Sequence, residues 1–449
     1  KKMTEYFQTI LSKRSSGLKG QIYIPSDKSI SHRALILGSL AIGKTSILRL
    51  LESDDIFKTI NGLKALGVDI YKESDKWFVH GVGVGGFCEP ENIIDCGNSG
   101  TSARLLMGLV STCPIKVTFT GDDSLRKRPM DRVVKPLSEF GAIFSSNHDS
   151  KLPINVIGSS EPIPINYNLQ IPSAQVKSAI LLAGLNVRGK TTVLENEPTR
   201  DHTEKMLKFL GANVQIEKKG SSNNISVNGF PKLNPGIISV PGDISSASFP
   251  IALACMIPNS ELIIKSVGLN PLRDGFIETL IEMGANIEIH NKSIEAGELV
   301  ADLHVSYSPN LVGVEVPEDR SARMIDEYPI LSILAATATG PTIMKGIEEL
   351  RYKESDRIEA IADGLEGNGV SITKKRDQLT VFGKGNQKIK GGSIVNASND
   401  HRIAMSFASL GSITENSIEI RGASSIKTSF PNFIDLMNSI GLNIISLKD

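Results

Sequence analysis

The sequence has little cysteine and no net charge. The four cysteines stand singly, at Cys88, Cys96, Cys113 and Cys255. They show neither the paired spacing of a zinc site nor the density of a disulfide framework, so we expect a reducing compartment. Lys plus Arg and Asp plus Glu both total 49, which leaves no overall field to attract nucleic acid or an anionic membrane. Any anion binding must therefore come from local clusters of basic residues.

The sequence also lacks long apolar runs. Its first ten residues, KKMTEYFQTI, have neither the apolar stretch of a signal peptide nor the Arg- and Ser-rich character of a transit peptide, and no later run could span a bilayer. We expect a cytoplasmic monomer with no membrane or nucleic-acid partner. The content of 40 % hydrophobic residues is enough for two or three domains with their own cores.

What the sequence does contain is a repeat with two markers. The first marker is an apolar helix end, then a glycine, then a strand, and it occurs at Gly67, Gly141, Gly211, Gly284, Gly369 and Gly441. Glycine at such a position closes a helix in the left-handed conformation that other side chains disfavour. The pattern predicts six helices that end at these glycines.

The second marker is a polar residue suited to an N-cap, followed by a helix rich in Ala, Ser and Leu. It occurs at roughly 70- to 85-residue steps, at Asp27, Asn98, Ser173, Asp243, Asp326 and Asp400. Short β-branched runs such as KVTFTG lie between the two helices, and runs such as ISVNGF follow the second. Both markers predict an α/β fold of six βαβαββ units. A solenoid without chemistry is the alternative, and the differing cap sequences argue against it.

Basic residues gather at or near the starts of these helices. Exposed N–H groups and the helix dipole favour anions there, and phosphate is a natural ligand. Arginine grips carboxylate or phosphate with two hydrogen bonds, while lysine acts as a mobile point charge. Any single one of these side chains could be an ordinary solvated charge. Their clustering at matching repeat positions favours an anion site built from Lys28, Arg33, Arg126, Lys127, Arg128, Lys177, Arg200, Lys353, Arg357, Arg402 and Lys427.

Eight short motifs follow one another along the chain: SDKSISHR, GNSGTSAR, KRPM, PSAQVKS, RDHTE, DEYP, YKESDR and NDHR. In these motifs the sequence resembles the 5-enolpyruvylshikimate-3-phosphate synthase family of enolpyruvyl transferases over essentially its whole length. The resemblance implies two similar domains of three repeats each, which are joined by two crossovers and close on substrates in a cleft between them. We expect residues 1–24 with 245–449 to form the first domain and residues 25–244 the second.

The resemblance also implies the reaction. The enolpyruvyl (1-carboxyvinyl) group of phosphoenolpyruvate would pass to the 5-hydroxyl of shikimate 3-phosphate by addition and elimination, with release of phosphate, in aromatic amino acid (chorismate) biosynthesis. The hydroxyl adds to C2 while C3 gains a proton, and the proton step is then reversed as phosphate leaves. This chemistry needs an acid and a base, and the resemblance implies neither a metal nor another cofactor. The enzyme would be a target of glyphosate.

Site residues follow from the resemblance, motif by motif. Shikimate 3-phosphate would be bound by Lys28, Ser29, Arg33, Ser173, Ala174, Gln175, Arg200, Asp326 and Lys353. Phosphoenolpyruvate would be bound by Lys28, Gly100, Arg128, Gln175, Arg357, Arg402 and Lys427, with Asn98 shaping the turn at Gly100. Asp326 would accept the hydroxyl proton, although it could equally be a plain helix N-cap. Glu354, with Lys28 close by, would deliver the proton to C3, and which group moves which proton stays open.

Other patterns suggest different functions. The segment GSLAIGKT, residues 38–45, matches a P-loop, but it follows a predicted helix where a P-loop follows a strand. GVGVGG, residues 81–86, matches a dinucleotide fingerprint without a helix behind it. The sister enzyme that uses UDP-N-acetylglucosamine typically has a cysteine in the loop before the Arg-Pro pair, and TGDDSLRKRP has none. A non-catalytic anion-binding repeat protein is the remaining alternative.

Two positions depart from related patterns. SAQVK and RDHTE resemble the glyphosate-tolerant subgroup of the family, in which an alanine often replaces Gly100 and crowds the inhibitor. This chain keeps the glycine, so we predict only partial tolerance. Glu349 stands where some relatives have asparagine, and we leave it out of the predicted site.

Overall fold

The computed structural model describes residues 9–147 and 149–447, which fall into two compact units. Unit 1 takes in the described parts of Lys1–Pro25, Gly242–Ser293 and Leu299–Asp449. Unit 2 takes in Ser26–Pro241, less residue 148, together with Ile294–Glu298. Most of the amino-terminal stretch that we inspected for a targeting signal, residues 1–8, lies outside the described residues.

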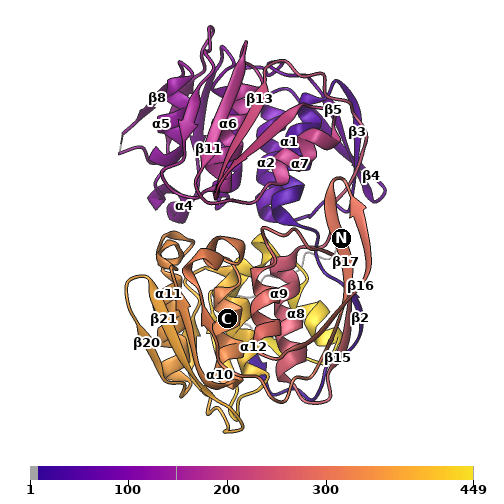
Figure 1. The fold of residues 1–449 in the computed structure, drawn as a ribbon, viewed down its shortest axis with the longest axis vertical. Helices are drawn as coiled ribbons and strands as arrows, with labels where there is room; N and C mark the ends of the chain where they lie inside the picture. Colours follow the sequence, from indigo (N-terminus) through magenta and orange to yellow (C-terminus); the bar gives the residue numbers. More distant parts are fainter. Residues whose placement is uncertain (1–8, 148, 448–449) are drawn as a thin grey trace. The chain divides into compact units, whose positions relative to one another are not determined.

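Each unit contains three four-stranded sheets among the described residues. Figure 1 shows the chain as a ribbon, with labels on many of its helices and strands. In every sheet the first two strands are parallel and the third is antiparallel to the second. In unit 2 the sheets are β14 (Ile237–Ser239), β3 (Gly43–Leu48), β5 (Lys76–Gly81), β4 (Asp69–Glu73); β6 (Ile94–Asp95), β7 (Lys116–Thr120), β9 (Ile154–Ile157), β8 (Ile143–Ser146); and β10 (Asn166–Asn168), β11 (Lys190–Glu195), β13 (Ser222–Asn228), β12 (Val214–Lys219). In unit 1 they are β2 (Lys19–Tyr23), β15 (Glu261–Gly268), β17 (Glu298–Ser306), β16 (Asn286–Glu295); β18 (Glu315–Val316), β19 (Thr339–Lys345), β21 (Gln378–Lys384), β20 (Ile372–Lys374); and β22 (Ile394–Asn396), β23 (Ile418–Arg421), β1 (Thr9–Lys13), β24 (Asn443–Leu447). Six sheets of one pattern confirm the six predicted repeats.

Three strands join a sheet that lies far from them in the sequence. One is β1, which pairs with β23 and β24 of the sixth repeat. The other two lie next to the passages of the chain between the units. The strand before the first repeat, β2, pairs with β15 of the fourth repeat, with Ile22 opposite Ile264. The strand before the fourth repeat, β14, pairs with β3 of the first repeat, with Ile238 opposite Ile47. The chain therefore passes from one unit to the other just after β2 and just after β14. Each of these strands pairs in parallel with a strand more than 180 positions away.

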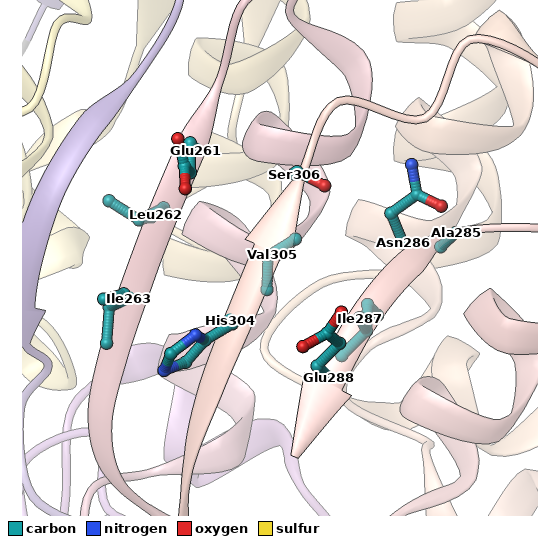
Figure 2. A pocket seen from close by; sticks show the side chains of 10 residues that line it. All are labelled: Glu261, Leu262, Ile263, Ala285, Asn286, Ile287, Glu288, His304, Val305 and Ser306. Atoms are coloured by element: carbon teal, nitrogen blue, oxygen red, sulfur yellow. The ribbon is translucent and has the colours of Figure 1, made fainter. Parts of the chain in front are cut away.

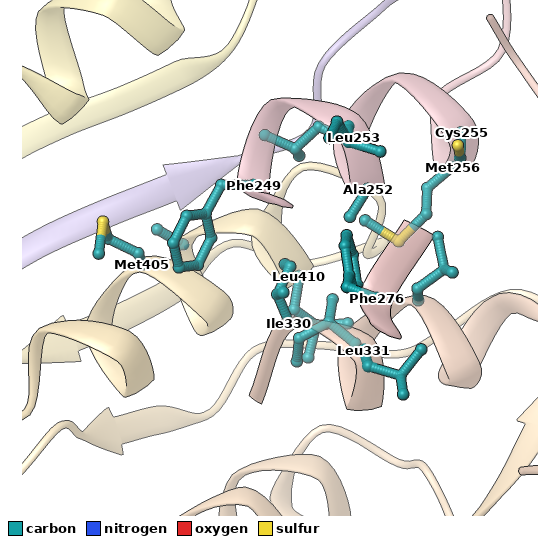
Figure 3. Packing of buried hydrophobic residues seen from close by; sticks show 14 of the residues in the cluster. Phe249, Ala252, Leu253, Cys255, Met256, Phe276, Ile330, Leu331, Met405 and Leu410 are labelled. Atoms are coloured by element: carbon teal, nitrogen blue, oxygen red, sulfur yellow. The ribbon is translucent and has the colours of Figure 1, made fainter. Parts of the chain in front are cut away.

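The first helix of each repeat is buried. In α8 and α12 every residue is buried, so these helices, rich in Ala, Ser and Leu, have no solvent-exposed face. Figure 3 shows Phe249, Leu253, Phe276, Leu331 and Leu410 packed together in the core of unit 1. The first helices are α1 (Lys28–Leu40), α3 (Gly100–Val110), α6 (Ala174–Gly184), α8 (Ile244–Met256), α10 (Tyr328–Thr337) and α12 (His401–Gly411).

The second helix of each repeat ends at a predicted glycine. All six of these glycines have a positive φ between +88° and +124°, so the helix-end prediction is confirmed. The second helices are α2 (Asp54–Ala65), α5 (Asp131–Glu139), α7 (His202–Phe209), α9 (Gly275–Glu282), α11 (Arg357–Gly367) and α13 (Phe433–Ser439). Short extra turns are α4 (Asp123–Lys127) and the 3-10 helices η1 (Glu318–Arg323), η2 (Glu348–Tyr352) and η3 (Ala423–Thr428).

The P-loop match is a coincidence of sequence. Gly38 lies in the last turn of α1, and Lys44 and Thr45 lie in β3, so the order is helix, turn and strand. The Lys44 ammonium sits 4.0 Å from the ring centre of Phe78. This Gly-Lys-Thr does not open a helix and so offers no N-terminus to a phosphate.

Candidate active site

Five of the first helices begin with a side-chain cap. The caps are Asp27, Ser99, Ser173, Asp243 and Asp400. The prediction of Asn98 as a cap is wrong by one residue, because the Ser99 hydroxyl accepts from the Ser102 N–H at 3.1 Å. The N-cap of α10 is Glu327, and it makes no side-chain cap bond. Asp326 therefore lies one residue before the N-cap of α10, and its side chain contacts Arg357.

In unit 2, Lys28 and Arg33 extend from the first turns of α1. The Lys28 ammonium lies 2.9 Å from the Asp55 carboxylate. Arg33 is buried, and its guanidinium donates to the Ser29 carbonyl, Ser178 Oγ and Thr203 Oγ1 at 3.0, 2.9 and 2.7 Å. Burial lowers the pKa of Arg33 to about 10, against the opposing charges of carboxylates that include Glu204. Arg33 is thus held rigidly among neutral partners.

Gly100, Arg128 and Gln175 lie around Arg104 in unit 2. The Asn98 side chain accepts from Arg128 Nη2 at 2.9 Å. Gln175 accepts from Arg104 Nη1 at 2.6 Å. Gly100 lies between the two arginines, since a Cβ added there would stand 3.1 Å from Arg104 Nη1 and 3.3 Å from Arg128 Nη1. Arg104 ends a quoted motif, yet our sequence-based site omitted it.

The other predicted residues of unit 2 lie at or next to the ends of helices. Ser173 Oγ accepts from the Val176 N–H at 3.4 Å as the cap of α6, and Ala174 is the first residue of that helix. Arg200 precedes α7, and its charge acts on Arg33. Arg126 and Lys127 are exposed at the end of α4.

Lys177 is a structural residue. Its ammonium is fully buried, 3.1 Å from Glu195 and 2.7 Å from Glu204. Although burial lowers the pKa of Lys177, these two carboxylates outweigh it and raise the pKa above its ordinary value. Its inclusion among the anion-binding cations was wrong, because two buried carboxylates already neutralise its positive charge.

Lys177→Met should therefore cost stability. Removing one partner of a buried ion pair leaves uncompensated charge, so we expect a loss of about 3–5 kcal/mol in the free energy of unfolding. Urea unfolding measures it, with the exposed Lys190→Met as the control, which should change stability by less than about 0.5 kcal/mol. Unchanged stability together with weaker substrate binding would identify Lys177 as a ligand after all.

In unit 1 the predicted residues converge on one buried guanidinium. Arg357 Nε lies 2.8 Å from Asp400, Nη2 lies 2.7 Å from Glu354, and Nη1 lies 3.3 Å from Asp326. Burial alone would lower the pKa of Arg357, but the carboxylates of Asp400, Glu354 and Asp326 raise it. Arg357 therefore stays charged and holds the two proposed proton-transfer groups, Asp326 and Glu354, on one fixed centre.

Lys353 lies beside this centre. Burial lowers the pKa of its ammonium, with Asp326 opposing and Arg357 adding to the effect. The Glu349 charge acts on Lys353 as well, so the residue that we left out of the site lies close to it.

Arg402 differs from Arg357 in having no acid partner. It is 5 % exposed at the start of α12, and its backbone N–H donates to Asp400 at 2.9 Å. Within residues 9–147 and 149–447, its guanidinium has no ion pair, and its buried Nε has no hydrogen-bond partner. A buried cation of this kind is costly unless a ligand supplies the missing anion. Lys427 lies in η3, which packs on α12.

A groove of about 390 Å³ lies elsewhere in unit 1. Figure 2 shows it along β15, β17 and β16, with Glu261, Glu288 and His304 among its lining residues. None of the predicted site residues lines it. In the described part of the chain, no cluster of three or more His, Cys, Asp or Glu side chains has the arrangement of a metal site, and no helix there has the length and apolar character needed to cross a membrane.

Comparison with known proteins gives consistent results over the whole chain. A family model described as EPSP synthase (3-phosphoshikimate 1-carboxyvinyltransferase) matches residues 12–437. A 3-phosphoshikimate 1-carboxyvinyltransferase of Ruegeria sp. (strain TM1040) is 50 % identical over 435 residues, which cover 97 % of each chain. One from Cereibacter sphaeroides is 50 % identical over 438 residues, covering 97 % of this chain and 98 % of that one.

A solved structure of an EPSP synthase from Acinetobacter baumannii has the same fold. It superposes with a TM-score of 0.87 at 41 % sequence identity, covering 98 % of this chain and 100 % of the other. The six-repeat α/β prediction is thereby confirmed against an experimental structure. With the family model and the relatives at 50 % identity, this result shows that the chain belongs to the EPSP synthase (3-phosphoshikimate 1-carboxyvinyltransferase) family, a family of transferases of the shikimate pathway.

Proposed function

We propose that the chain binds phosphoenolpyruvate and shikimate 3-phosphate with residues of both units. From unit 2, shikimate 3-phosphate is bound by Lys28, Ser29, Arg33, Ser173, Ala174, Gln175 and Arg200, and phosphoenolpyruvate by Lys28, Gly100, Arg128 and Gln175. From unit 1, Asp326 and Lys353 complete the first set, and Arg357, Arg402 and Lys427 complete the second. Several negative charges on two substrates repel one another unless a dense cationic site offsets them.

The arrangement around Arg357 is the observation that carries this proposal. Two carboxylates with partly exposed side chains, Asp326 and Glu354, are held by one buried guanidinium. A reaction with two opposite proton steps needs two such groups at fixed positions. Because Arg357 holds both, their spacing does not depend on flexible side chains.

Each proton then has a donor and an acceptor. Asp326 accepts the 5-hydroxyl proton as the 5-oxygen bonds to C2 of phosphoenolpyruvate, and C3 gains a proton from Glu354, with Lys28 as its proposed partner. In the elimination, C3 returns a proton to Glu354, the C2=C3 bond re-forms and the bond from C2 to the phosphate oxygen breaks. The proton that Asp326 accepted leaves with the phosphate. Phosphate leaves, and the enolpyruvyl ether of shikimate 3-phosphate remains. The surrounding cations stabilise the charge on the carboxylate and the departing phosphate.

A coupled assay tests the function. The purified chain should release phosphate from phosphoenolpyruvate only when shikimate 3-phosphate is present. Release with UDP-N-acetylglucosamine as the acceptor would point to the sister enzyme. Failure with either acceptor at high enzyme concentration would contradict the proposal.

Gly100→Ala should weaken inhibition by glyphosate more than it weakens the binding of phosphoenolpyruvate. The new Cβ would press on the guanidinium ends of Arg104 and Arg128, which can shift slightly, so the fold should survive. We expect the KM for phosphoenolpyruvate to rise less than about tenfold and inhibition by glyphosate to weaken by more than that. Gly236→Ala is the control, since a Cβ there meets nothing within 4 Å. Equal inhibition of the wild type and Gly100→Ala would refute the steric explanation.

The cysteines support a cytoplasmic location, which we propose together with a monomeric state. Cys96 and Cys255 are buried free thiols, and burial raises the pKa of both to about 12. Such thiols are inert packing residues and need no oxidising compartment. Light scattering at assay concentrations tests the monomeric state.

A further inference from the structure

The start of α7 needs support from outside the helix. Arg200, a proposed ligand of shikimate 3-phosphate, lies two residues before it. The N-cap of α7, Asp201, makes no side-chain cap bond, and its carboxylate pairs with Lys205 at 2.7 Å. The direction in which the chain presents Arg200 therefore depends on what holds the first turn.

Three consecutive buried residues hold that turn. Each contacts a different part of unit 2, so the turn is fixed from several sides. The contacts are His202 Nδ1 with Glu298 Oε1 at 2.6 Å, Thr203 Oγ1 with Arg33 Nε at 2.7 Å, and Glu204 Oε1 with Lys177 Nζ at 2.7 Å. Two of these contacts come from α1 and α6, and the one to Glu298 comes from a different repeat.

Glu298 belongs to the tip of the β16–β17 hairpin. The tip, residues 294–298, groups with unit 2, although most of β16 and β17 lies in unit 1. Glu298 is only 3 % exposed, and its charge also acts on Arg33, a second proposed ligand of shikimate 3-phosphate. Burying a carboxylate costs free energy unless the group is paired. Glu298 is paired with His202, which lies near the proposed ligands Arg200 and Arg33.

The same tip carries a second glutamate in a different setting. Glu295 pairs with Arg49, and both side chains are about a third exposed to solvent. Its carboxylate also accepts from Ser239 Oγ at 3.2 Å. An exposed pair of this kind contributes little to stability or geometry, so Glu295 is the matched control for Glu298.

We propose that Glu298 is a positioning residue for shikimate 3-phosphate. It holds His202 and, through the first turn of α7, the directions of Arg200 and Arg33. This inference rests on the proposed function, since those two arginines are assigned to shikimate 3-phosphate there. No step of the reaction is assigned to Glu298.

The test compares steady-state kinetics of variants of the full chain. Glu298→Ala should raise the KM for shikimate 3-phosphate about tenfold, because a charge-assisted hydrogen bond to His202 is lost. The KM for phosphoenolpyruvate and kcat should change less than about threefold. Glu298→Gln, which keeps an oxygen for His202, should restore most of the affinity. Glu295→Ala should behave as the wild type.

Several outcomes would overturn this inference. They are a KM for shikimate 3-phosphate within twofold of the wild type in Glu298→Ala, an equal rise in Glu295→Ala, or an equal rise in the KM for phosphoenolpyruvate. If Glu298→Ala does not fold, Glu298→Asp withdraws the carboxylate by one methylene, and an unchanged KM there has the same meaning. A wild type without activity on shikimate 3-phosphate would instead contradict the proposed function.

Discussion

Replacing Asp326 by asparagine should lower kcat about a thousandfold, within the range typical of losing a general acid or base. The amide keeps an oxygen for Arg357 Nη1, which lies 3.3 Å from the Asp326 carboxylate, so the geometry around the guanidinium should survive. The KM values should change much less than kcat, because the lost function is proton acceptance and not charge pairing with a substrate. Phosphate release under saturating substrates measures the effect.

Asp319→Asn is the control for this loss. Asp319 lies seven residues earlier, is exposed, and carries the same charge and the same change in chemistry. It should keep wild-type activity. Should Asp326→Asn retain more than about a tenth of the wild-type kcat, Asp326 is not the group that accepts the hydroxyl proton, and Glu354 becomes the candidate for both proton steps.

Arg402→Gln should weaken phosphoenolpyruvate binding without loss of stability. The Arg402 guanidinium has no acid partner in the described part of the chain, so its removal leaves no carboxylate uncompensated. We expect the KM for phosphoenolpyruvate to rise about a hundredfold, the equivalent of about 3 kcal/mol for a charged hydrogen-bond donor. The free energy of unfolding should stay the same or increase slightly.

Arg357→Gln is the matched comparison and should behave differently. It leaves Asp326, Glu354 and Asp400 near one another without their shared cation. We expect a loss of about 3–5 kcal/mol in the free energy of unfolding in addition to the loss of activity. Urea unfolding and steady-state kinetics on both variants measure the difference. If both variants lose stability equally, Arg402 is a structural cation and its assignment to phosphoenolpyruvate fails.

The difference between these two arginines was invisible in the sequence. Both lie in short motifs that resemble the family, and both were assigned to phosphoenolpyruvate in the same way. What separates them is the pairing of Arg357 with side chains up to 43 positions away. Lys177 makes the same point, because its two buried partners come from β11 and α7. The local sequence shows that a residue carries a positive charge. Which carboxylates pair with that charge depends on how distant segments of the chain pack together.

Helix boundaries could be predicted because their signals are local. A glycine in the left-handed conformation ends each second helix, and a polar side chain bonds the first N–H groups of five of the six first helices. Where the signal was ambiguous, as at Asn98 beside Ser99, the prediction missed by one residue. At Asp326 the cap signal was misleading, because that side chain pairs with Arg357.

By itself the sequence determined the repeat, the number of units, the chemical class of the site and the family, since all of these depend on local patterns that recur at matching positions. Only the tertiary structure decided which strands exchange between sheets, which cations are already neutralised, and that Glu298 lies beside His202. These features join residues 18 to more than 200 positions apart. Such contacts depend on how whole repeats pack, and no short segment of the chain encodes them.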